Sequence, residues 1–110
     1  MSDQRFARTE MLVGRAGVER LAAASVAVFG IGGVGSYAAE ALARAGVGKL
    51  TLVDHDVIDV TNINRQIHAL TETVGTPKTE AMAHRIHSIN PVCNLREIRA
   101  FYQPDEADAF

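Results

Sequence analysis

The 110-residue sequence has a single cysteine, no tryptophan and few aromatic residues, which make up 5% of the chain. One cysteine, Cys93, cannot form an internal disulfide and cannot bind zinc without other ligands, which favours a reducing compartment. No apolar run approaches the roughly 18 residues of a membrane span, and the N-terminus lacks the pattern of a signal peptide. These absences predict a soluble, cytoplasmic protein without a membrane partner.

A cluster of basic side chains is also missing. The 11 lysines and arginines are scattered among 13 acidic residues, so the net charge is −2 and no nucleic-acid footprint is visible. Hydrophobic residues make up 47% of the chain and charged residues 22%, which is ordinary for a globular protein. The length suits one domain or a piece of one.

What is present is an alternation of short apolar runs and helical patterns. Residues 3–24 predict two short helices with a break at the segment VGRAG, and residues 1–24 therefore form a leading arm. Residues 25–29 predict a strand buried on both faces, residues 34–45 a helix that stops at a glycine, and residues 49–54 a second buried strand. Strand, helix and strand in about 30 residues make a βαβ unit.

The second half of the chain continues this alternation after an irregular segment. Residues 55–75 predict a long polar loop with room for a turn of helix, and a loop of that length is often functional. A helix follows, with Thr76 as its N-cap and its end at Asn90, and residues 93–101 predict a third strand. The acidic stretch over residues 103–110 is typical of the beginning of another helix.

The predicted fold class is α/β, with the N-terminal half of a Rossmann-like doubly wound sheet behind the helical arm. Three parallel strands with crossover helices make only half of such a sheet, and sheets of this class are normally covered on both faces. We therefore predict that residues 25–110 are the N-terminal part of a nucleotide-binding domain that continues beyond this sequence.

Four glycines lie between the first strand and the first crossover helix, in the segment VFGIGGVGS. Gly30, Gly32 and Gly35 satisfy the G-x-G-x-x-G pattern, and their place between strand and helix makes the match meaningful. The pattern provides a tight turn, a backbone that can approach a phosphate, and close packing of helix on strand. Gly33, the Ser36 hydroxyl and the helix dipole add to this anion site. A sharp turn without a ligand is the alternative.

Charged residues downstream indicate which nucleotide this loop holds. Asp54 ends the second strand 19 residues after Gly35, where an acid binds a ribose, and Asp56 is a second candidate ligand of the nucleotide. Arg65 lies in the loop expected over the carboxyl ends of the strands, where it can bind phosphate oxygens. Lys78 occupies the first turn of a helix, where the interaction of a cation with the helix dipole costs about 0.3 to 1 kcal/mol. A bound anion would remove that cost.

Each of these residues also has a simpler interpretation. An arginine in a polar loop is usually solvated, a lysine usually lies at the surface, and a loop that leaves a strand is commonly acidic. Together the two cations favour a triphosphate over NAD, because charge grows at one phosphorus during phosphoryl transfer and hydride transfer has no comparable need. An NAD-binding module without catalytic activity is the alternative from another class.

The other chemistry-bearing residues receive no role from the sequence. His84 and His87 share a helix face without a nearby carboxylate or cysteine pair, which is typical of an exposed polar face rather than a metal site. Cys93 opens a strand and is expected to be a small buried residue rather than a nucleophile. His55 and His68 lie in the loop without an evident partner, and no metal ligand is assigned in the chain.

The ordered set of glycine loop, D-x-D, N-x-x-R-Q and G-x-x-K resembles the adenylating enzymes of the ubiquitin-activating type. That superfamily includes the molybdopterin-synthase and thiazole-biosynthesis adenylyltransferases, and the resemblance extends from about residue 5 to residue 91. It implies that residues 25–110 belong to an ATP-binding Rossmann-like domain. The segments RFARTEML, TNINRQ and INPVC are most similar to the branch that dehydrates threonylcarbamoyladenosine in tRNA.

The resemblance also implies roles for individual residues. The ATP loop would consist of the four glycines and Ser36, with Asp54 on the ribose. Around the phosphates the family places the residues that correspond here to Asn62, Arg65, Gln66 and Lys78. Arg65 and Lys78 would stabilise charge as pyrophosphate leaves, which makes them catalytic candidates. Arg8 matches an arginine that reaches into the partner subunit's site, which implies a homodimer.

The implied reaction transfers AMP from ATP and Mg²⁺ to the carboxylate of the threonylcarbamoyl group, and the ring then closes with loss of AMP. The tRNA is the implied substrate, although its contact surface is not visible in this segment. The family's magnesium ligand and acceptor site would lie beyond residue 110, so this segment alone is expected to be inactive. The alternative within the superfamily adenylates the C-terminus of a ubiquitin-like sulfur carrier, and its usual sequence differs at Thr9, Thr61, Ile63 and Asn64.

Overall fold

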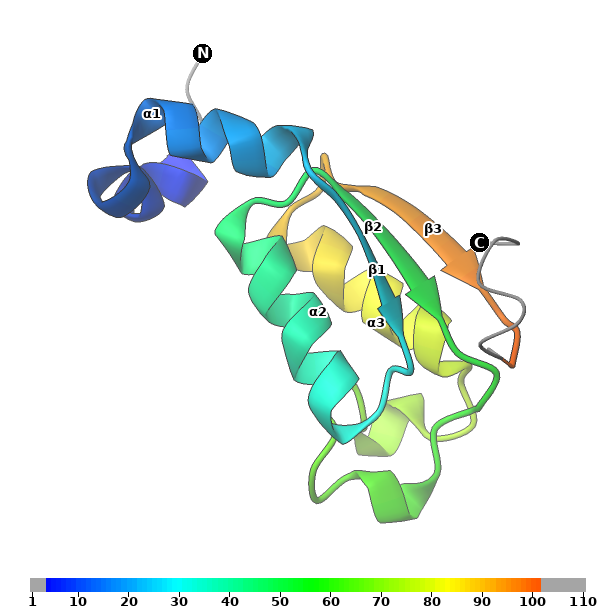
Figure 1. Ribbon diagram of the computed structural model, residues 1–110. Helices are drawn as coiled ribbons and strands as arrows, with labels where there is room; N and C mark the ends of the chain where they lie inside the picture. The colour runs from blue at the N-terminus through cyan, green and yellow to red at the C-terminus, as the bar shows by residue number, and fades with distance from the viewer. Residues whose placement is uncertain (1–3, 102–110) are drawn as a thin grey trace.

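A computed structural model describes residues 4–101 of the chain. Strands and helices alternate behind a helical arm, and one long loop separates the second strand from the last helix (Figure 1). The elements are η1 (Gln4–Phe6), α1 (Ala7–Ala23), β1 (Ser25–Phe29), α2 (Gly33–Ala45), β2 (Lys49–Val53), η2 (Val60–Asn62), η3 (Thr71–Thr73), α3 (Lys78–Ile89) and β3 (Asn94–Ile98). The predicted α/β class with crossover helices is confirmed.

The three strands form one parallel sheet in the order β1-β2-β3. Val26, Leu50 and Leu95 are partners in the parallel register, so their side chains point to the same face of the sheet. This face forms the hydrophobic core with the buried helix residues Ala39, Ala43, Met82, Ala83 and Ile86. Both crossover helices therefore cover the same side of the sheet, as successive right-handed crossovers require.

The exposure of β1 shows that a strand buried on both faces was the wrong prediction. Ser25, Ala27 and Phe29 are exposed, and the two valines between them are partly buried against the core. Among the described residues β1 is an edge strand, and no described helix lies on its other face (Figure 1). A run of branched apolar residues indicates a strand, but the covering of its faces depends on elements elsewhere in the chain.

The break predicted in the helical arm is confirmed at Gly14, where φ of 77° and ψ of 169° interrupt α1. Phe6 packs against the C-terminal end of α2, with its ring 3.5 Å from the position that a Cβ of Gly46 would take. Met11 and Leu12 of the arm are both exposed. The arm lies at the end of the sheet where the strands begin, far from the loops that follow the strands (Figure 1).

The N-cap predicted for α3 at Thr76 is wrong, because the cap residue is Pro77 and no side chain caps this helix. The Thr76 carbonyl oxygen accepts instead from the Ile58 N–H at 2.8 Å. The Lys78 N–H, the first of the helix, donates to the Asp56 carbonyl oxygen at 3.0 Å. Backbone groups of the preceding loop therefore satisfy the helix end, which a pattern of side-chain caps does not reveal.

The remaining differences from the sequence predictions are at element ends. β3 is shorter than predicted, and Phe101 follows it as an exposed residue. The long loop contains the short helices η2 and η3. The helix predicted over residues 103–110 lies outside the described residues. Within residues 4–101, no helix has both the length and the apolar character needed to cross a bilayer.

Candidate nucleotide-binding site

The glycine loop joins β1 to α2 at the carboxyl end of the sheet. At two of its positions the backbone conformation or the lack of space favours glycine. Gly30 turns the chain at φ +87°, and its N–H donates to the Val53 carbonyl oxygen at 2.8 Å. A Cβ at Gly35 would overlap the carbonyl oxygen of Gly30, so any side chain there collides with the backbone. These contacts are the tight turn and the close helix–strand packing that a nucleotide loop requires.

Asp54 follows β2 and holds the glycine loop through its carboxylate. Oδ2 accepts from the Ile31 N–H at 2.6 Å, and Oδ1 accepts from the Asp56 N–H at 2.8 Å. An ionised carboxylate offers about four lone-pair sites, so each oxygen can also accept from a ribose hydroxyl. The residue predicted to bind a ribose therefore also fixes the backbone beside it.

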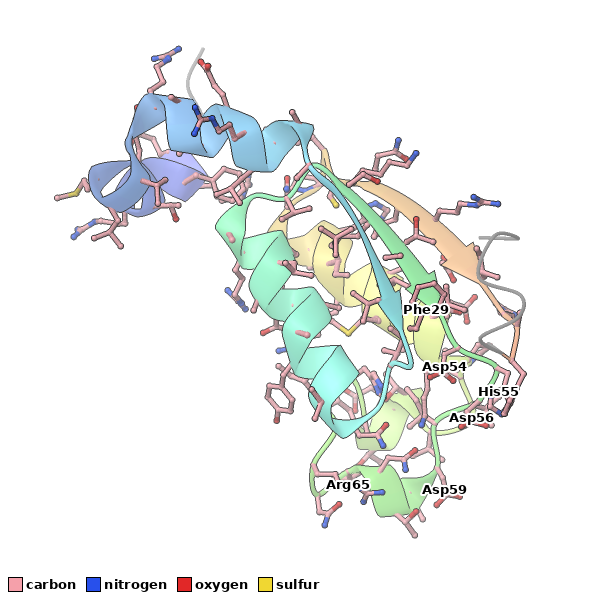
Figure 2. All side chains as sticks on the ribbon, viewed as in Figure 1. Phe29, Asp54, His55, Asp56, Asp59 and Arg65 are labelled. Carbon is pink, nitrogen blue, oxygen red and sulfur yellow. The ribbon has the colours of Figure 1, made fainter. Side chains whose placement is uncertain are left out.

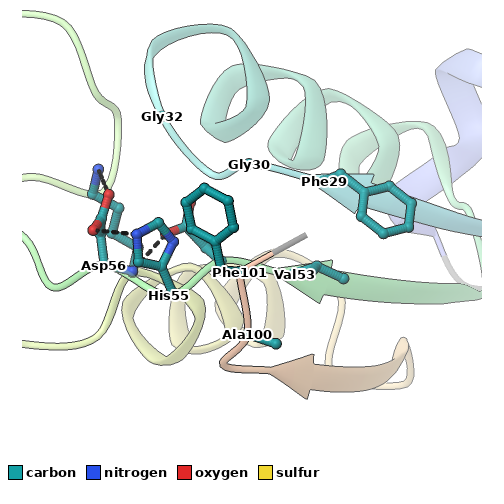
Figure 3. Close-up of a pocket in the computed structure, with 10 residues that line it drawn as sticks. Phe29, Gly30, Gly32, Val53, His55, Asp56, Ala100 and Phe101 are labelled. Atoms are coloured by element: carbon teal, nitrogen blue, oxygen red, sulfur yellow. Dashed lines mark hydrogen bonds and ion pairs between the residues drawn. The ribbon is translucent and has the colours of Figure 1, made fainter. Parts of the chain in front are cut away.

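A cavity of about 400 Å³ opens between the glycine loop and the ends of β2 and β3 (Figure 3). Of the nucleotide-binding residues that the sequence singled out, it brings five together. Its lining consists of Phe29, Gly30, Gly32, Val53, Asp54, His55, Asp56, Lys78, Ala100 and Phe101. One side of the cavity is therefore apolar and aromatic, and the other carries backbone amides, carboxylates and a cation.

Lys78 is buried rather than solvated, with 7% of its surface exposed. It is the only lysine or arginine among the described residues that line the cavity. Its Nζ lies 3.9 Å from Oδ2 of Asp56, which is the limit of an ion pair. Burial and the helix dipole both disfavour this ammonium group, and its one carboxylate partner lies at the limit of contact. A further anion in the cavity would therefore stabilise it.

His55 is a pocket residue to which the sequence gave no role. Its Nε2 lies 3.1 Å from Oδ1 of Asp56, and its ring is 4.7 Å from the ring of Phe101 at a tilt of 59° (Figure 3). One ligand atom each from Asp54, His55 and Asp56 lies within 4.8 Å of the others. This donor set does not fit a resident magnesium ion, because magnesium prefers oxygen ligands, His55 offers a nitrogen, and Asp56 already faces Lys78 and His55.

Ser36 and Gln66 are buried beside the glycine loop and do not line the cavity. Ser36 is fully buried, and its Oγ accepts from the Ile67 N–H at 3.3 Å. Gln66 is also buried, and its Nε2 lies 3.8 Å from the position that a Cβ of Gly32 would take. Both residues were predicted to lie at the nucleotide, and the structure brings both close to the glycine loop but not to the cavity lining.

Arg65 and Asn62 lie farther along the loop, outside the cavity. The Arg65 guanidinium is exposed, and Nη1 donates to the Thr61 carbonyl oxygen at 3.0 Å and to Oδ1 of Asn64 at 2.8 Å. Figure 2 shows Arg65 apart from Asp54, at the far side of the loop. Asn62 is buried, and its Oδ1 accepts from the Asp59 N–H at 2.8 Å. The structure does not bring these two residues to the cavity.

Two further candidates occupy other places. Gly33 is the first residue of α2, beyond the cavity lining. Arg8 is exposed in α1, which lies at the opposite end of the sheet from the glycine loop (Figure 1). Within one chain, Arg8 and the cavity are therefore at opposite ends of the sheet.

His68 and Cys93 are the buried titratable residues of the loop and of the segment before β3. Burial lowers the pKa of His68, and the Lys78 charge acts in the same direction, while a hydrogen bond to the Ile31 carbonyl opposes them. Cys93 is buried, as predicted, and burial raises the pKa of its thiol. The only feature of the sequence that could have pointed to His68 is its position two residues after Gln66.

The fold is that of a Rossmann-type domain, with a cavity at the carboxyl end of its parallel sheet. Residues 6–110 match the ThiF family, and the chain belongs to that family. The chain is 51% identical over 105 residues to the tRNA threonylcarbamoyladenosine dehydratase of Bacillus subtilis, which covers 96% of this chain and 41% of that protein. It is also 42% identical over 89 residues to the molybdopterin-synthase adenylyltransferase of Salmonella typhimurium, which covers 81% of this chain and 36% of that protein.

Solved structures agree with these relatives. The structure of E. coli tRNA N6-threonylcarbamoyladenosine dehydratase in complex with ATP matches with a TM-score of 0.91 at 52% identity. This match covers 94% of the present chain and 42% of the E. coli chain, and it confirms the Rossmann-like fold. The chain spans about two fifths of the length of the relatives that it matches.

Proposed function

We propose that the protein carrying this chain is an ATP-dependent enzyme that dehydrates threonylcarbamoyladenosine in tRNA, in the cytoplasm. The observation that carries the proposal is the buried Lys78 ammonium, which faces a cavity edged by the glycine loop and Asp54. The chain is 52% identical to a protein that was crystallised with ATP, and this identity supports a triphosphate as the anion. The identity to the dehydratases, 51% for the B. subtilis protein, supports tRNA as the substrate.

In this function a carboxylate oxygen of the threonylcarbamoyl group attacks the α-phosphorus of ATP, and the bond to pyrophosphate breaks. Another atom of the same group then attacks the activated carbonyl carbon, the ring closes, and AMP leaves with the carboxylate oxygen. Lys78 and the glycine-loop N–H groups stabilise the charge that develops on the phosphate oxygens. Asp54 accepts from the ribose and holds the nucleotide in register with the loop. Magnesium belongs to this proposal as a companion of the triphosphate.

Asn62, Arg65 and Gln66 complete the proposed phosphate side of the site. Gln66 already lies against Gly32, whereas Arg65 has to exchange its bonds to Thr61 and Asn64 for a phosphate oxygen. We place Arg8 in the site of a second copy, because α1 lies at the opposite end of the sheet from the cavity of its own chain. The proposed enzyme is therefore a homodimer.

Adenylation of a ubiquitin-like sulfur carrier is the second candidate, and the 42% identity to a molybdopterin-synthase adenylyltransferase favours it. The two candidates share the ATP site and differ in the acceptor. The full-length protein should exchange pyrophosphate into ATP when tRNA bearing threonylcarbamoyladenosine is added. Exchange that responds only to a ubiquitin-like protein supports the second candidate, and binding of NAD without ATP supports a module without catalytic activity.

The role of Lys78 is tested against the other lysine of the chain, Lys49, which is exposed at the beginning of β2. Lys78→Ala should lower ATP turnover about a hundredfold, because it removes the cation that faces the departing phosphate. Lys49→Ala should leave turnover unchanged. The two variants are compared by pyrophosphate release at saturating tRNA, with thermal unfolding as the check on folding. Equal turnover in both variants would show that Lys78 is not a phosphate ligand.

A further inference from the structure

Residues 66–68 contact the glycine loop and the first turn of α2 at three successive positions. Nε2 of Gln66 lies beside Gly32, and the Ile67 N–H donates to Oγ of Ser36 at 3.3 Å. Nε2 of His68 lies 2.7 Å from the carbonyl oxygen of Ile31. This segment is 30 residues or more away in sequence, so the contacts are tertiary and hold the loop from the side of the core.

The hydrogen bond to Ile31 fixes the tautomer of His68. A carbonyl oxygen only accepts, so Nε2 carries the proton and Nδ1 presents a lone pair. The ring is 2% exposed, and Nδ1 has no partner among the described residues. Protonation of Nδ1 would bury a second N–H without an acceptor, and burial together with the charges of Lys78 and Arg85 opposes a cation there more than the Asp54 carboxylate favours one. The ring is therefore held as a neutral donor aimed at one carbonyl group.

The carbonyl that His68 holds shares a peptide plane with the N–H of Gly32. In a trans peptide the C=O and N–H bonds point in opposite directions. Gly32 lines the cavity, and its N–H has no acceptor among residues 4–101. Because the Ile31 carbonyl is turned toward buried His68, the Gly32 N–H is turned away from it. The preceding peptide is fixed as well, since Asp54 accepts from the Ile31 N–H at 2.6 Å.

We propose that His68 is a positioning residue that keeps the Gly32 N–H directed at the phosphate of a bound nucleotide. The proposal rests on the proposed function only in taking the ligand to be anionic. Rotation of the Ile31–Gly32 peptide would turn φ of Gly32 from −101° to a positive value, which glycine adopts at little cost. The rotated peptide would present a carbonyl oxygen to the phosphate. A donor at His68 removes that freedom.

The test compares His68→Leu, which fills the space without a donor, with His68→Gln, whose Nε2–H can reach the same carbonyl. The full-length protein is titrated with ATP and with adenosine by calorimetry. His68→Leu should lower ATP affinity about tenfold, the effect expected for losing a hydrogen bond to a charged group, and should change adenosine affinity less than twofold. His68→Gln should restore ATP affinity. His84→Gln, at an exposed histidine of α3, is the matched control and should bind as the wild type does.

Several results would overturn the proposal. Wild-type ATP affinity in His68→Leu would show that the hydrogen bond is not needed, and an equal loss of ATP and adenosine affinity would show a purely structural role. If His68→Leu does not fold, nitrogen-15 NMR of the wild type decides, because the Gly32 amide should shift with ATP and not with adenosine. A wild type that binds NAD and not ATP contradicts the proposed function alone, and the same comparison is then made between NAD and adenosine.

Discussion

The glycine loop and the segment 59–65 both lie at the carboxyl end of the sheet, but they are held in different ways. Gly30 and Ile31 of the glycine loop bond to Val53 and Asp54 at the end of β2, and Ile31 also bonds to His68. In segment 59–65 the side-chain bonds stay inside the segment. They join Asp59 to Thr61 and Asn62, and Arg65 to Thr61 and Asn64.

This difference separates a preformed part of the site from a part that a ligand can recruit. The glycine loop keeps its shape because three distant residues, Val53, Asp54 and His68, hold it, so its amides need no reorganisation when an anion arrives. Segment 59–65 keeps a local shape that does not depend on the glycine loop. Arg65 can therefore exchange its internal bonds for a phosphate without breaking contacts in the core.

The largest expected effect is at Gly35, where helix and loop approach each other most closely. Gly35→Ala should lower the free energy of unfolding by more than about 3 kcal/mol, because the added Cβ overlaps the Gly30 carbonyl oxygen. Gly33→Ala is the matched control, since a Cβ there meets nothing within 4 Å. That variant should be neutral or stabilised by up to about 1 kcal/mol. Urea unfolding measures both, and similar midpoints would contradict a rigidly held glycine loop.

Regular local patterns made most of this fold predictable from the sequence. The end of α2 at a glycine and the break near Gly14 follow from local backbone preferences, and the structure has both. The exposed face of β1 and the cap of α3 did not follow, because they depend on which distant segments come near. α3 begins after Pro77, and the N–H of Lys78, its first residue, donates to the carbonyl oxygen of Asp56, 22 residues earlier in the chain.

A smaller effect is expected at Glu40, which connects the two crossover helices. Burial disfavours its charge, but hydrogen bonds from Arg85 of α3 and Arg44 of α2 outweigh this and hold the pKa of Glu40 below its usual value. Glu40→Gln should lower the free energy of unfolding by about 1 to 2 kcal/mol, because it weakens a largely buried ion pair. Because the folded pKa is lowered, the Glu40 contribution is present above pH 4.5 and is lost as pH falls through the folded value.

The matched control for Glu40 is Glu19, whose partner Arg15 lies one turn away on α1. Both side chains of that pair are exposed, so Glu19→Gln should change stability by less than about 0.5 kcal/mol. Urea midpoints at pH 7 and pH 4 give the comparison. A wild type and a Glu40→Gln variant that lose stability equally between these pH values would show that Glu40 does not hold α2 and α3 together.

The residues of the candidate site also differ in how far the sequence predicts their positions. Gly30 and Asp54 were predictable because parallel strands place the residues that follow them at one edge of the sheet, and Lys78 because the helix that leads back to the next strand begins at that edge. His68 was not, since a histidine in a polar loop has no periodic signal and its partner, Ile31, is 37 residues away. Arg65 fits the motif of the family but lies outside the cavity, because a motif fixes residue types and leaves side-chain direction to the loop.

The smallest expected effect on stability, and the sharpest test of the comparison, is at Arg65. Arg65→Ala should change the free energy of unfolding by less than about 0.5 kcal/mol, because the side chain is exposed and bonds only within its own segment. The same variant should lower ATP turnover about 10- to 100-fold if a bound triphosphate recruits the guanidinium. Arg96→Ala, at an exposed arginine of β3, should change neither quantity. Unchanged turnover in Arg65→Ala would show that Arg65 does not bind the triphosphate. Lys78 would then be the one phosphate-binding cation among the described residues. A loss of more than 1 kcal/mol in stability would show that segment 59–65 is part of the rigid framework after all.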